Sequence, residues 1–227
     1  MRSFTLRGLT LYLPEAALKG NLERALSSGR YENHEADALL THLRPGDRFL
    51  DLGAGLGFIC ALAAGVLGEA AVAGVEAGPE TVKLARKNLA ANGFGGVKVI
   101  RGAVVGAGEG EVEFGQRPAF WASGLKGPEG WPDNAEVIRV PARPMAKLLA
   151  RYSPTVICCD IEGGELEVLT QPLPGVRLVV VETHPEVYGA AGVERIGAAL
   201  SAQGFVETEG AKRDTLVFRR SGGAGTE

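Results

Sequence analysis

The chain has 227 residues, of which 45% are hydrophobic and 22% are charged, a balance that suits one globular unit with a sizeable core. Its formal net charge of −3 argues against a broad basic face for nucleic acid or an anionic membrane. Three cysteines, two of them adjacent and none in a CxxC pair, make a poor disulfide framework and favour a reducing, cytoplasmic setting.

Neither a secretory signal nor a membrane span is expected. Arg7 and Gly8 interrupt the first apolar stretch before it becomes long enough for a signal. Glu69 lies in the middle of the longest apolar run, which reads better as a buried helix followed by a buried strand.

Apolar periodicity and turn residues predict a hairpin and helix within residues 1–30, a larger unit over 31–220 and a frayed tail over 221–227. The predicted elements are a hairpin at 4–13, helices at 15–28 and 32–43, a strand at 48–52, a helix at 56–67, a strand at 71–77, a helix at 79–93, strands at 97–102, 111–114, 135–140 and 154–161, a helix starting within 162–171, a strand at 176–183, a helix at 192–204 and an antiparallel pair at 205–209 and 214–220. Strands that alternate with helices imply a mostly parallel sheet with helices on both faces.

The stretch DLGAGLGF, residues 51–58, places three glycines directly after a buried strand. Gly53 and Gly55 permit positive φ and remove side chains that would block a ligand, and Gly57 lets the next helix approach the strand. The N–H groups at the start of that helix favour an anionic group. The spacing is GxGxG and not the dinucleotide pattern GxGxxG, because Phe58 occupies the third glycine position.

The strand at 71–77 carries Glu76 near its end, where a carboxylate can accept hydrogen bonds from both ribose hydroxyls and would repel a 2′-phosphate. A GxGxG turn followed by this acid resembles the class I, Rossmann-like methyltransferases that use S-adenosylmethionine. The alternative is a glycine turn that only joins a strand to a helix.

Two later stretches resemble the FkbM-type methyltransferases. CCDIEGGELEVL at 158–169 is similar to their K-x-D-x-E-G-x-E signature, and VVETHP at 180–185 is similar to their acid-x-His strand end. The stretches at 30–40 and 84–93 also resemble that family, so the resemblance spans about residues 30–210. It implies an α/β fold, a three-layer Rossmann-like methyltransferase fold with a mostly parallel seven-stranded sheet, an antiparallel C-terminal strand and a small N-terminal hairpin.

The sequence departs from the FkbM pattern at two positions. Gly55 stands where the family often has Asn, and Cys158 stands where it has Lys. The second departure leaves the charge partner of Asp160 open, with Arg143 and Lys147 as the candidates considered.

The cofactor implied is S-adenosylmethionine. Asp160 interrupts an apolar strand, and a buried carboxylate needs a partner such as the sulfonium or ammonium of that cofactor. The predicted cofactor-binding residues are Glu32, Asp51, Gly53, Ala54, Gly55, Gly57, Glu76, Ala77, Ala103 and Asp160, with Val104 as a further wall of the adenine slot.

The candidate catalytic residues are His184, then Asp160 and Glu162. A neutral imidazole at His184 could accept the proton of a hydroxyl as the methyl group arrives. Alternatively, His184 only shapes its loop, and Glu162 and Glu165 stabilise a helix N-terminus. No metal is assigned, although these side chains and Glu182 could converge, in types that suit Mg²⁺ or Mn²⁺ better than Zn²⁺.

The expected reaction is methylation of a hydroxyl on a small molecule or sugar by direct displacement. The alternatives are a methyltransferase that acts on a nitrogen of a small molecule or RNA, and a non-catalytic protein that binds the cofactor. The expected partner is a hydroxylated small molecule, with no nucleic acid and no membrane, and homo-oligomerisation is left open. The loop at 117–134 is expected to roof the acceptor pocket, with Trp121 and Trp131 either stacked on the acceptor or anchoring the loop.

Overall fold

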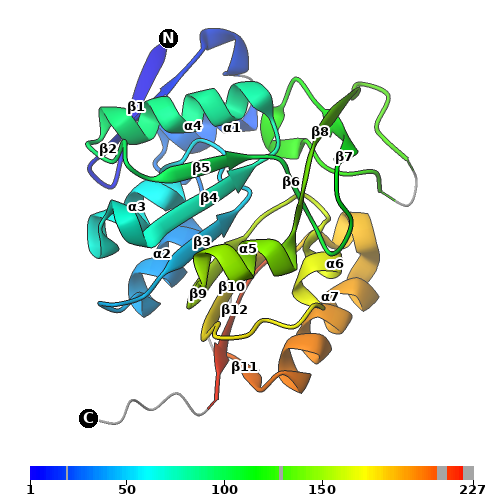
Figure 1. The fold of residues 1–227 in the computed structure, drawn as a ribbon. Coiled ribbons are helices and arrows are strands. Elements are labelled where there is room, and N and C mark those ends of the chain that lie inside the picture. The colour runs from blue at the N-terminus through cyan, green and yellow to red at the C-terminus, as the bar shows by residue number, and fades with distance from the viewer. Residues whose placement is uncertain (19, 128–129, 209–213, 222–227) are drawn as a thin grey trace.

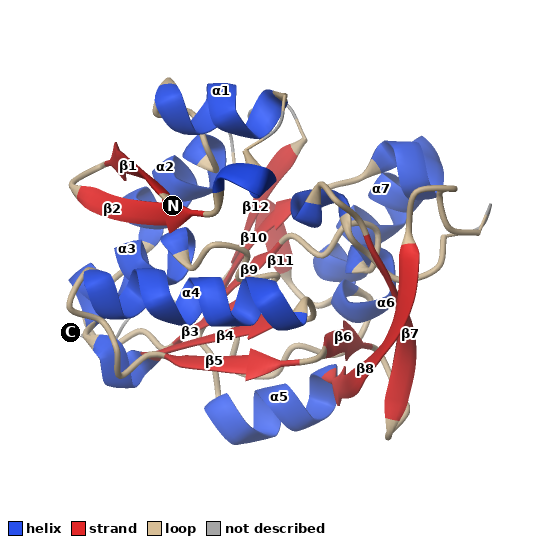
Figure 2. Ribbon diagram, turned by 90° about the horizontal axis from the view of Figure 1, so that it is seen from above, coloured by secondary structure: helices blue, strands red, loops and turns tan. Residues whose placement is uncertain are grey.

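The computed structural model describes residues 1–18, 20–127, 130–208 and 214–221, and its centre is a seven-stranded sheet (Figures 1 and 2). The strand order is β11-β12-β10-β9-β3-β4-β5. The five parallel strands are β3 (Phe49–Leu52), β4 (Val72–Glu76), β5 (Lys98–Arg101), β9 (Val156–Cys159) and β10 (Leu178–Glu182). Next to β10, β12 (Thr215–Arg220) runs antiparallel and pairs in turn with β11 (Phe205–Glu207). The predicted sheet and its antiparallel C-terminal strand are confirmed.

Helices cover both faces of this sheet, because successive strand residues point to opposite faces. On one face, Val156 and Cys158 of β9 share a core with α2 (Asn33–His42), α3 (Phe58–Leu67) and α4 (Pro79–Ala91). On the other face, Ile157 and Cys159 share a core with α5 (Met145–Tyr152), α6 (Glu165–Leu169) and α7 (Pro185–Ala202). The three-layer prediction is therefore confirmed.

The N-terminal hairpin packs on α4. It consists of β1 (Arg2–Leu6) and β2 (Leu9–Leu13), whose residues Leu11 and Leu13 are fully buried in the first core. Two asparagine side chains accept hydrogen bonds from the hairpin backbone, each 2.8 Å long. Asn88 on α4 accepts from the Tyr12 N–H, and Asn92 directly after α4 accepts from the Thr10 N–H. The small hairpin is confirmed, and it is a packed part of the core.

Several element bounds differ from the sequence-based expectations. The helix expected at 15–28 is a 3₁₀ turn, η1 (Glu15–Ala17), followed by α1 (Asn21–Ser27), and Gly20 between them has φ +57°. Helix α7 begins at Pro185, seven residues earlier than expected, with a non-helical Gly189 inside it. Helix α5 was not predicted, although its buried Met145, Leu148 and Leu149 follow helical spacing.

A second sheet of three strands lies beyond the carboxyl end of β5. Its order is β6-β8-β7, from β6 (Ala103–Val105), β7 (Glu111–Gln116) and β8 (Glu136–Pro144). No strand was predicted at residues 103–105, but they pair in parallel with the far end of β8. Two further 3₁₀ turns are η2 (Glu69–Ala71) and η3 (Phe120–Ala122).

Within the described residues, no helix combines the length and the apolar character needed to cross a membrane. The tail expected at 221–227 lies outside the described residues except for Ser221. The division of the chain at residue 30 stays a prediction.

The turn after β3 depends on Gly53. Its φ is +93°, and a Cβ at this position would lie 1.7 Å from the backbone carbonyl oxygen of Asp160. The close approach of the turn to the end of β9 therefore requires glycine, in addition to the positive φ that the sequence predicts.

We predict that Gly53→Ala costs several kcal/mol of unfolding free energy or prevents folding, because the new methyl group meets main chain that cannot move aside. Gly46→Ala is the matched control, since Gly46 has φ +87° with nothing within 4 Å of its added Cβ. That control should cost only about 1–2 kcal/mol, the penalty of the backbone conformation itself. Denaturant unfolding measures both variants, and equal losses would contradict the close approach.

Candidate functional site

A pocket opens at the carboxyl ends of β3, β4 and β9. Its empty volume is about 670 Å³, part of it open to solvent, which lies in the usual range for a small-molecule site. The loops after these strands form its floor, and β6, β7 and the segment around η3 cover it. The lining residues are Tyr31, Glu32, Gly53, Gly55, Val75, Glu76, Ala77, Gly102, Ala103, Val104, Phe114, Phe120, Trp121, Ser123, Leu125, Asp160, Ile161 and Glu162.

The glycine turn fits tightly against its surroundings. A Cβ on Gly55, at φ +47°, would lie 3.3 Å from the Tyr31 hydroxyl and 3.5 Å from Oε1 of Glu32. A Cβ on Gly57 would lie 3.1 Å from the carbonyl oxygen of Ala85. Gly57 thus permits contact with α4, and not the expected contact between its own helix and the strand.

The N–H groups of the turn are engaged within the protein. Gly53 and Ala54 both donate to the carbonyl oxygen of Val75 at 2.9 Å, and Gly57 donates to that of Ala54 at 2.7 Å. Gly55 donates to the Glu76 carboxylate. These four N–H groups are therefore not free to bind an anion, and they do not form a phosphate cradle like that of dinucleotide-binding folds. The expectation that the N–H groups at the start of the next helix favour an anionic group stays a prediction.

Glu76 lies at the rim between β4 and the turn. Its Oε2 accepts from the Gly55 N–H at 3.0 Å, and its Oε1 accepts from the Gly78 N–H at 2.7 Å. Burial raises the pKa of Glu76 to about 7, against these hydrogen bonds, which lower it. The carboxylate is thus fixed in orientation and lines the pocket, where its remaining lone pairs can accept from a ligand.

The structure brings seven of the ten residues predicted to bind the cofactor to the pocket wall, and these are Glu32, Gly53, Gly55, Glu76, Ala77, Ala103 and Asp160. The other three are not among the lining residues. Asp51 is 3% exposed and accepts a hydrogen bond from the Cys60 thiol at 3.2 Å, whereas Ala54 is buried and faces Gly74. Gly57 faces α4.

The loop at 117–134, which was expected to cover the pocket, does so in part. Trp121 lines the pocket and stands edge-on to Phe120, with ring centroids 5.4 Å apart. Trp131 does not line it and instead lies against Gly115, with the Lys126 ammonium 5.3 Å from its ring centroid. Sequence reasoning missed Phe114, whose alternation within β7 gave the only signal that could have found it.

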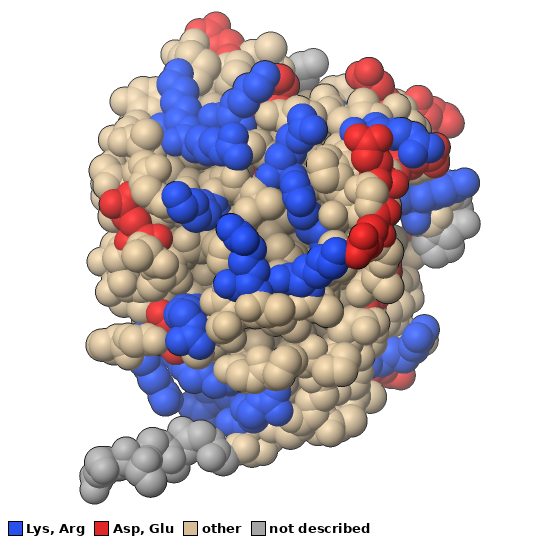
Figure 3. Space-filling model, viewed as in Figure 1, with Lys and Arg blue, Asp and Glu red and all other residues tan. Residues whose placement is uncertain are grey.

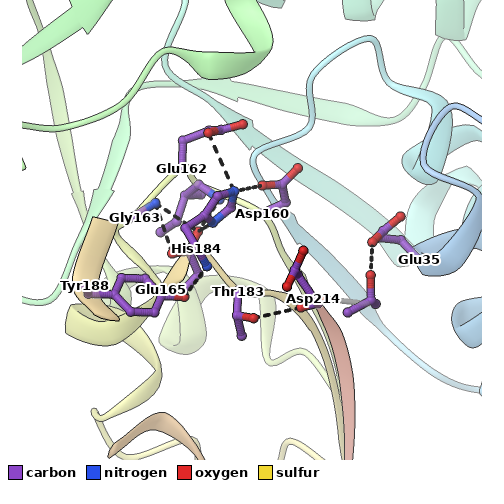
Figure 4. A network of polar contacts seen from close by, with 11 residues as sticks. Glu35, Asp160, Glu162, Gly163, Glu165, Thr183, His184, Tyr188 and Asp214 are labelled. Atoms are coloured by element: carbon purple, nitrogen blue, oxygen red, sulfur yellow. Dashed lines mark hydrogen bonds and ion pairs between the residues drawn. The ribbon is translucent and has the colours of Figure 1, made fainter. Parts of the chain in front are cut away.

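A cluster of acids surrounds His184 at one end of the pocket (Figure 4). Nε2 of His184 lies 3.6 Å from Oδ1 of Asp160 and 3.6 Å from Oε2 of Glu162. Its Nδ1 lies 3.2 Å from Oε1 of Glu165, which is fully buried. Asp160 and Glu162 follow β9, Glu165 begins α6 and His184 follows β10, and they meet because β9 and β10 are parallel neighbours.

The charge partners considered for Asp160 lie elsewhere. Arg143 donates from Nε to the Arg101 carbonyl oxygen at 2.9 Å, and Lys147 pairs with Glu109. Burial raises the pKa of Asp160 well above its ordinary value, and the nearby charge of Glu182 adds to the rise.

His184 differs from its expected state. Burial lowers its pKa, but the hydrogen bond and charge of Glu165, followed by the charge of Glu162, outweigh burial and raise the pKa to about 9. The neighbouring carboxylates thus favour the protonated form of the imidazole, and the role of His184 as proton acceptor stays a prediction. His184 also lies behind Asp160 and Glu162, outside the set of lining residues.

The electrostatics of the pocket are one-sided. Four carboxylates line it, those of Glu32, Glu76, Asp160 and Glu162, and the described lining residues include no Lys, Arg or His. Oδ1 of Asp160 is buried and has no hydrogen-bond partner. Because an unpaired buried carboxylate is costly, the pocket is suited to a ligand that carries positive charge.

The pKa values predict that stability falls as pH rises. Burial and the charge of Glu76 raise the pKa of Asp51 to about 7, against the hydrogen bond from Cys60. The titratable groups that face Asp51 are Cys60 on α3, Glu76 on β4, Cys158 on β9 and Glu32. Between pH 4 and 7 the folded state keeps a proton that the unfolded state releases, so rising pH favours unfolding.

The Asp51→Asn variant isolates this contribution. Its unfolding free energy should fall less with pH between 5 and 7 than that of the wild type, by up to about 1.4 kcal/mol per pH unit for one proton. Urea titrations at several pH values measure the two slopes. Parallel curves would show that Asp51 is ionised in the folded protein across this range.

The comparisons with known proteins agree with the fold. Residues 43–107 match a family model described as a methyltransferase domain, which covers less than half of the chain. No curated protein matches the sequence. The FkbM subtype is not confirmed by these comparisons.

Three solved structures illustrate the likeness. Trm5b from Pyrococcus abyssi has a TM-score of 0.53 at 15% identity, over 95% of this chain and 54% of that longer one. The precorrin-6y C5,15-methyltransferase from Geobacter metallireducens has a TM-score of 0.49 at 13% identity, over 93% and 94% of the two chains. An O-methyltransferase from Bacillus cereus has a TM-score of 0.44 at 13% identity, over 91% and 83%. Residues 43–107 therefore match a methyltransferase domain, and the chain around them has the Rossmann-like methyltransferase fold.

Proposed function

We propose that the protein is an S-adenosylmethionine-dependent methyltransferase that methylates a hydroxyl group on a small molecule or sugar, as the resemblance to the FkbM type implies. The observation that carries the proposal is the pocket lined by four carboxylates, with no cation among its described lining residues. S-adenosylmethionine brings a sulfonium and an ammonium to such a site, which offsets the cost of the buried carboxylates.

The residues present fit this cofactor from end to end. Glu76 would accept hydrogen bonds from the ribose hydroxyls, because the Gly55 and Gly78 N–H groups already orient its carboxylate. Ala77, Ala103 and Phe114 belong to one apolar cluster and would form the walls of the adenine slot. At the opposite end, Asp160 and Glu32 would face the two cationic groups of the cofactor.

When bound, the cofactor supplies a methyl group on a positively charged sulfur, which leaves as a neutral thioether. The chain then has to hold the acceptor oxygen in line with the methyl carbon and keep water out. Phe120 and Trp121 cover the pocket and serve the second task. Asp160 and Glu162 are the lining carboxylates that can take the hydroxyl proton, and Nε2 of His184 lies behind them, 3.6 Å from an oxygen of each.

RNA is the second candidate acceptor, and one observation favours it. Figure 3 shows Lys and Arg side chains gathered over α4, β5 and α5, on a molecule whose net charge is only −3. The exposed members include Lys87, Lys98, Arg101, Lys147 and Arg151. The overall charge therefore conceals a basic face that could contact phosphates. We favour the small-molecule acceptor because cations on an edge strand such as β5 also prevent sheet-to-sheet association.

The cofactor assignment predicts a specific effect of Glu76→Gln. The variant should bind S-adenosylmethionine about 10–100-fold more weakly, because it loses a charged hydrogen-bond acceptor worth about 1.5–3 kcal/mol. Isothermal titration calorimetry measures the dissociation constants. Glu80→Gln is the control, since Glu80 is exposed and pairs with Lys83, and it should bind like the wild type. Equal binding by all three proteins would remove Glu76 from the site.

The reaction assignment is tested by methyl transfer to a panel of hydroxylated sugars, lipids and aglycones, with unstructured RNA as a separate arm. We expect turnover with a hydroxylated small molecule, and a loss of at least about 100-fold in kcat for Asp160→Ala, in line with the usual contribution of a general base. Glu186→Gln, an exposed acid next in sequence to this region, should keep wild-type turnover. Methylation of RNA alone, or unchanged turnover in Asp160→Ala, would contradict the assignment.

A further inference from the structure

Three metal-ligand side chains converge beside the pocket. Asp160, Glu162 and His184 each present one donor atom, and these three atoms lie within 4.8 Å of one another (Figure 4). The side chains are largely withdrawn from solvent, with exposed fractions of 28%, 27% and 7%. They come from the ends of β9 and β10 and from the loop between β9 and α6.

Hydrogen bonds do not account for this arrangement. The two distances from Nε2 of His184, 3.6 Å each, exceed the range of an N–H···O bond. Oδ1 of Asp160 is buried and makes no hydrogen bond. Since buried polar atoms are nearly always satisfied, this unpartnered carboxylate oxygen points to a missing ligand.

The spacing suits a divalent cation. An ion about 2.1 Å from each donor holds neighbouring donors about 3 Å apart and opposite donors about 4 Å apart, so the three side chains need to close by only a fraction of an ångström. Ligating histidines usually present their second nitrogen to a carboxylate, which fixes the ring. Glu165 occupies that place, 3.2 Å from Nδ1, and is itself held by the Ile161 N–H at 2.8 Å and the Gly163 N–H at 3.0 Å.

We propose that Asp160, Glu162 and His184 bind one divalent cation of the Mn²⁺ type, for which Glu165 orients the imidazole. Two carboxylates and one imidazole form a donor set that Mn²⁺ accepts, whereas softer ions favour sulfur ligands and Mg²⁺ favours oxygen alone. The sequence by itself assigned no metal, and the convergence of these donor atoms is what the structure adds.

The catalytic role of the ion rests on the proposed methyltransferase function, for which the ion would select the acceptor. Asp160 and Glu162 also line the pocket, so the cation faces the place where the acceptor would lie. The acceptor class is then an alcohol whose oxygen binds the ion and becomes more acidic. In the transfer step, that oxygen forms a bond to the methyl carbon while the carbon–sulfur bond breaks and its electron pair goes to sulfur. The hydroxyl proton passes to the carboxylate oxygen of Glu162 that does not touch the ion.

The test uses the whole protein, stripped with EDTA and titrated with MnCl₂ by calorimetry and by electron paramagnetic resonance, without cofactor. We expect one Mn²⁺ per chain. Asp160→Asn and His184→Asn should each weaken binding at least about tenfold, and Glu165→Gln about 10–100-fold, as is usual for a carboxylate behind a ligating histidine. Glu186→Gln, on the exposed first turn of α7, is the matched control and should bind Mn²⁺ like the wild type.

Circular dichroism checks that each variant is folded, and Glu162→Gln, at the more open position, serves if another variant unfolds. Absence of Mn²⁺ binding by the folded wild type, or equal affinity in all variants, would overturn the metal site. Titration of the EDTA-treated protein with S-adenosylmethionine separates the two proposals. Cofactor binding without Mn²⁺ binding would overturn the metal site and leave the methyltransferase proposal intact. Mn²⁺ binding without cofactor binding would support the metal site and contradict the methyltransferase proposal.

Discussion

The cost of burying carboxylates at the ends of the central strands is the constraint on which this site depends. Glu76, Asp160 and Glu162 end or follow β4 and β9, and burial is the first cause of the raised pKa of each. His184 lies behind the pocket wall, 3.6 Å from an oxygen of Asp160 and of Glu162, and the described lining residues include no Lys or Arg. A structure that gathers this much negative charge with so little compensation is poised to gain free energy from a cationic ligand.

The fold gathers these groups through its strand order. Parallel strands place their carboxyl ends on one side, and the order reverses between β3 and β9, where ligands bind in open α/β sheets. The missing side chain of Gly53 lets the turn after β3 touch the Asp160 carbonyl group, so the two halves of the pocket floor meet. The second sheet then supplies Ala103 and Phe114 as the apolar wall. Charge lies at one end of the pocket and apolar surface at the other, as an adenosyl sulfonium requires.

Much of this could be predicted from the sequence because the signals are local. The strand–glycine–helix pattern at 49–67 and the acid at Glu76 follow from spacing alone, and both lie where expected. Spacing along the chain could not show which strand residues face the pocket, because this depends on how the strands and helices pack together. Asp51 and Leu52 are neighbours on β3 that point to opposite faces, and only the assembled core shows that Asp51 meets Cys60 on α3 and does not face the ligand pocket.

Other features depend on tertiary contacts that no local pattern encodes. The pairing of β6 with the far end of β8 joins residues about 40 positions apart, so no local pattern predicted a strand at residues 103–105. The pKa of His184 is raised by Glu165 and Glu162, which reach it only when β9 and β10 pair. This rise could not be predicted from the ordinary pKa of histidine, whereas the position of His184 beside Asp160 and Glu162 was expected.

A crystal structure of the protein grown with S-adenosylmethionine tests the central claim most directly. The account predicts that the ribose hydroxyls lie within hydrogen-bonding distance of the Glu76 carboxylate and that the sulfonium lies at the end of the pocket that Asp160 occupies. A nucleoside bound at another surface, or a pocket that stays empty at saturating cofactor while the protein is folded, would contradict it.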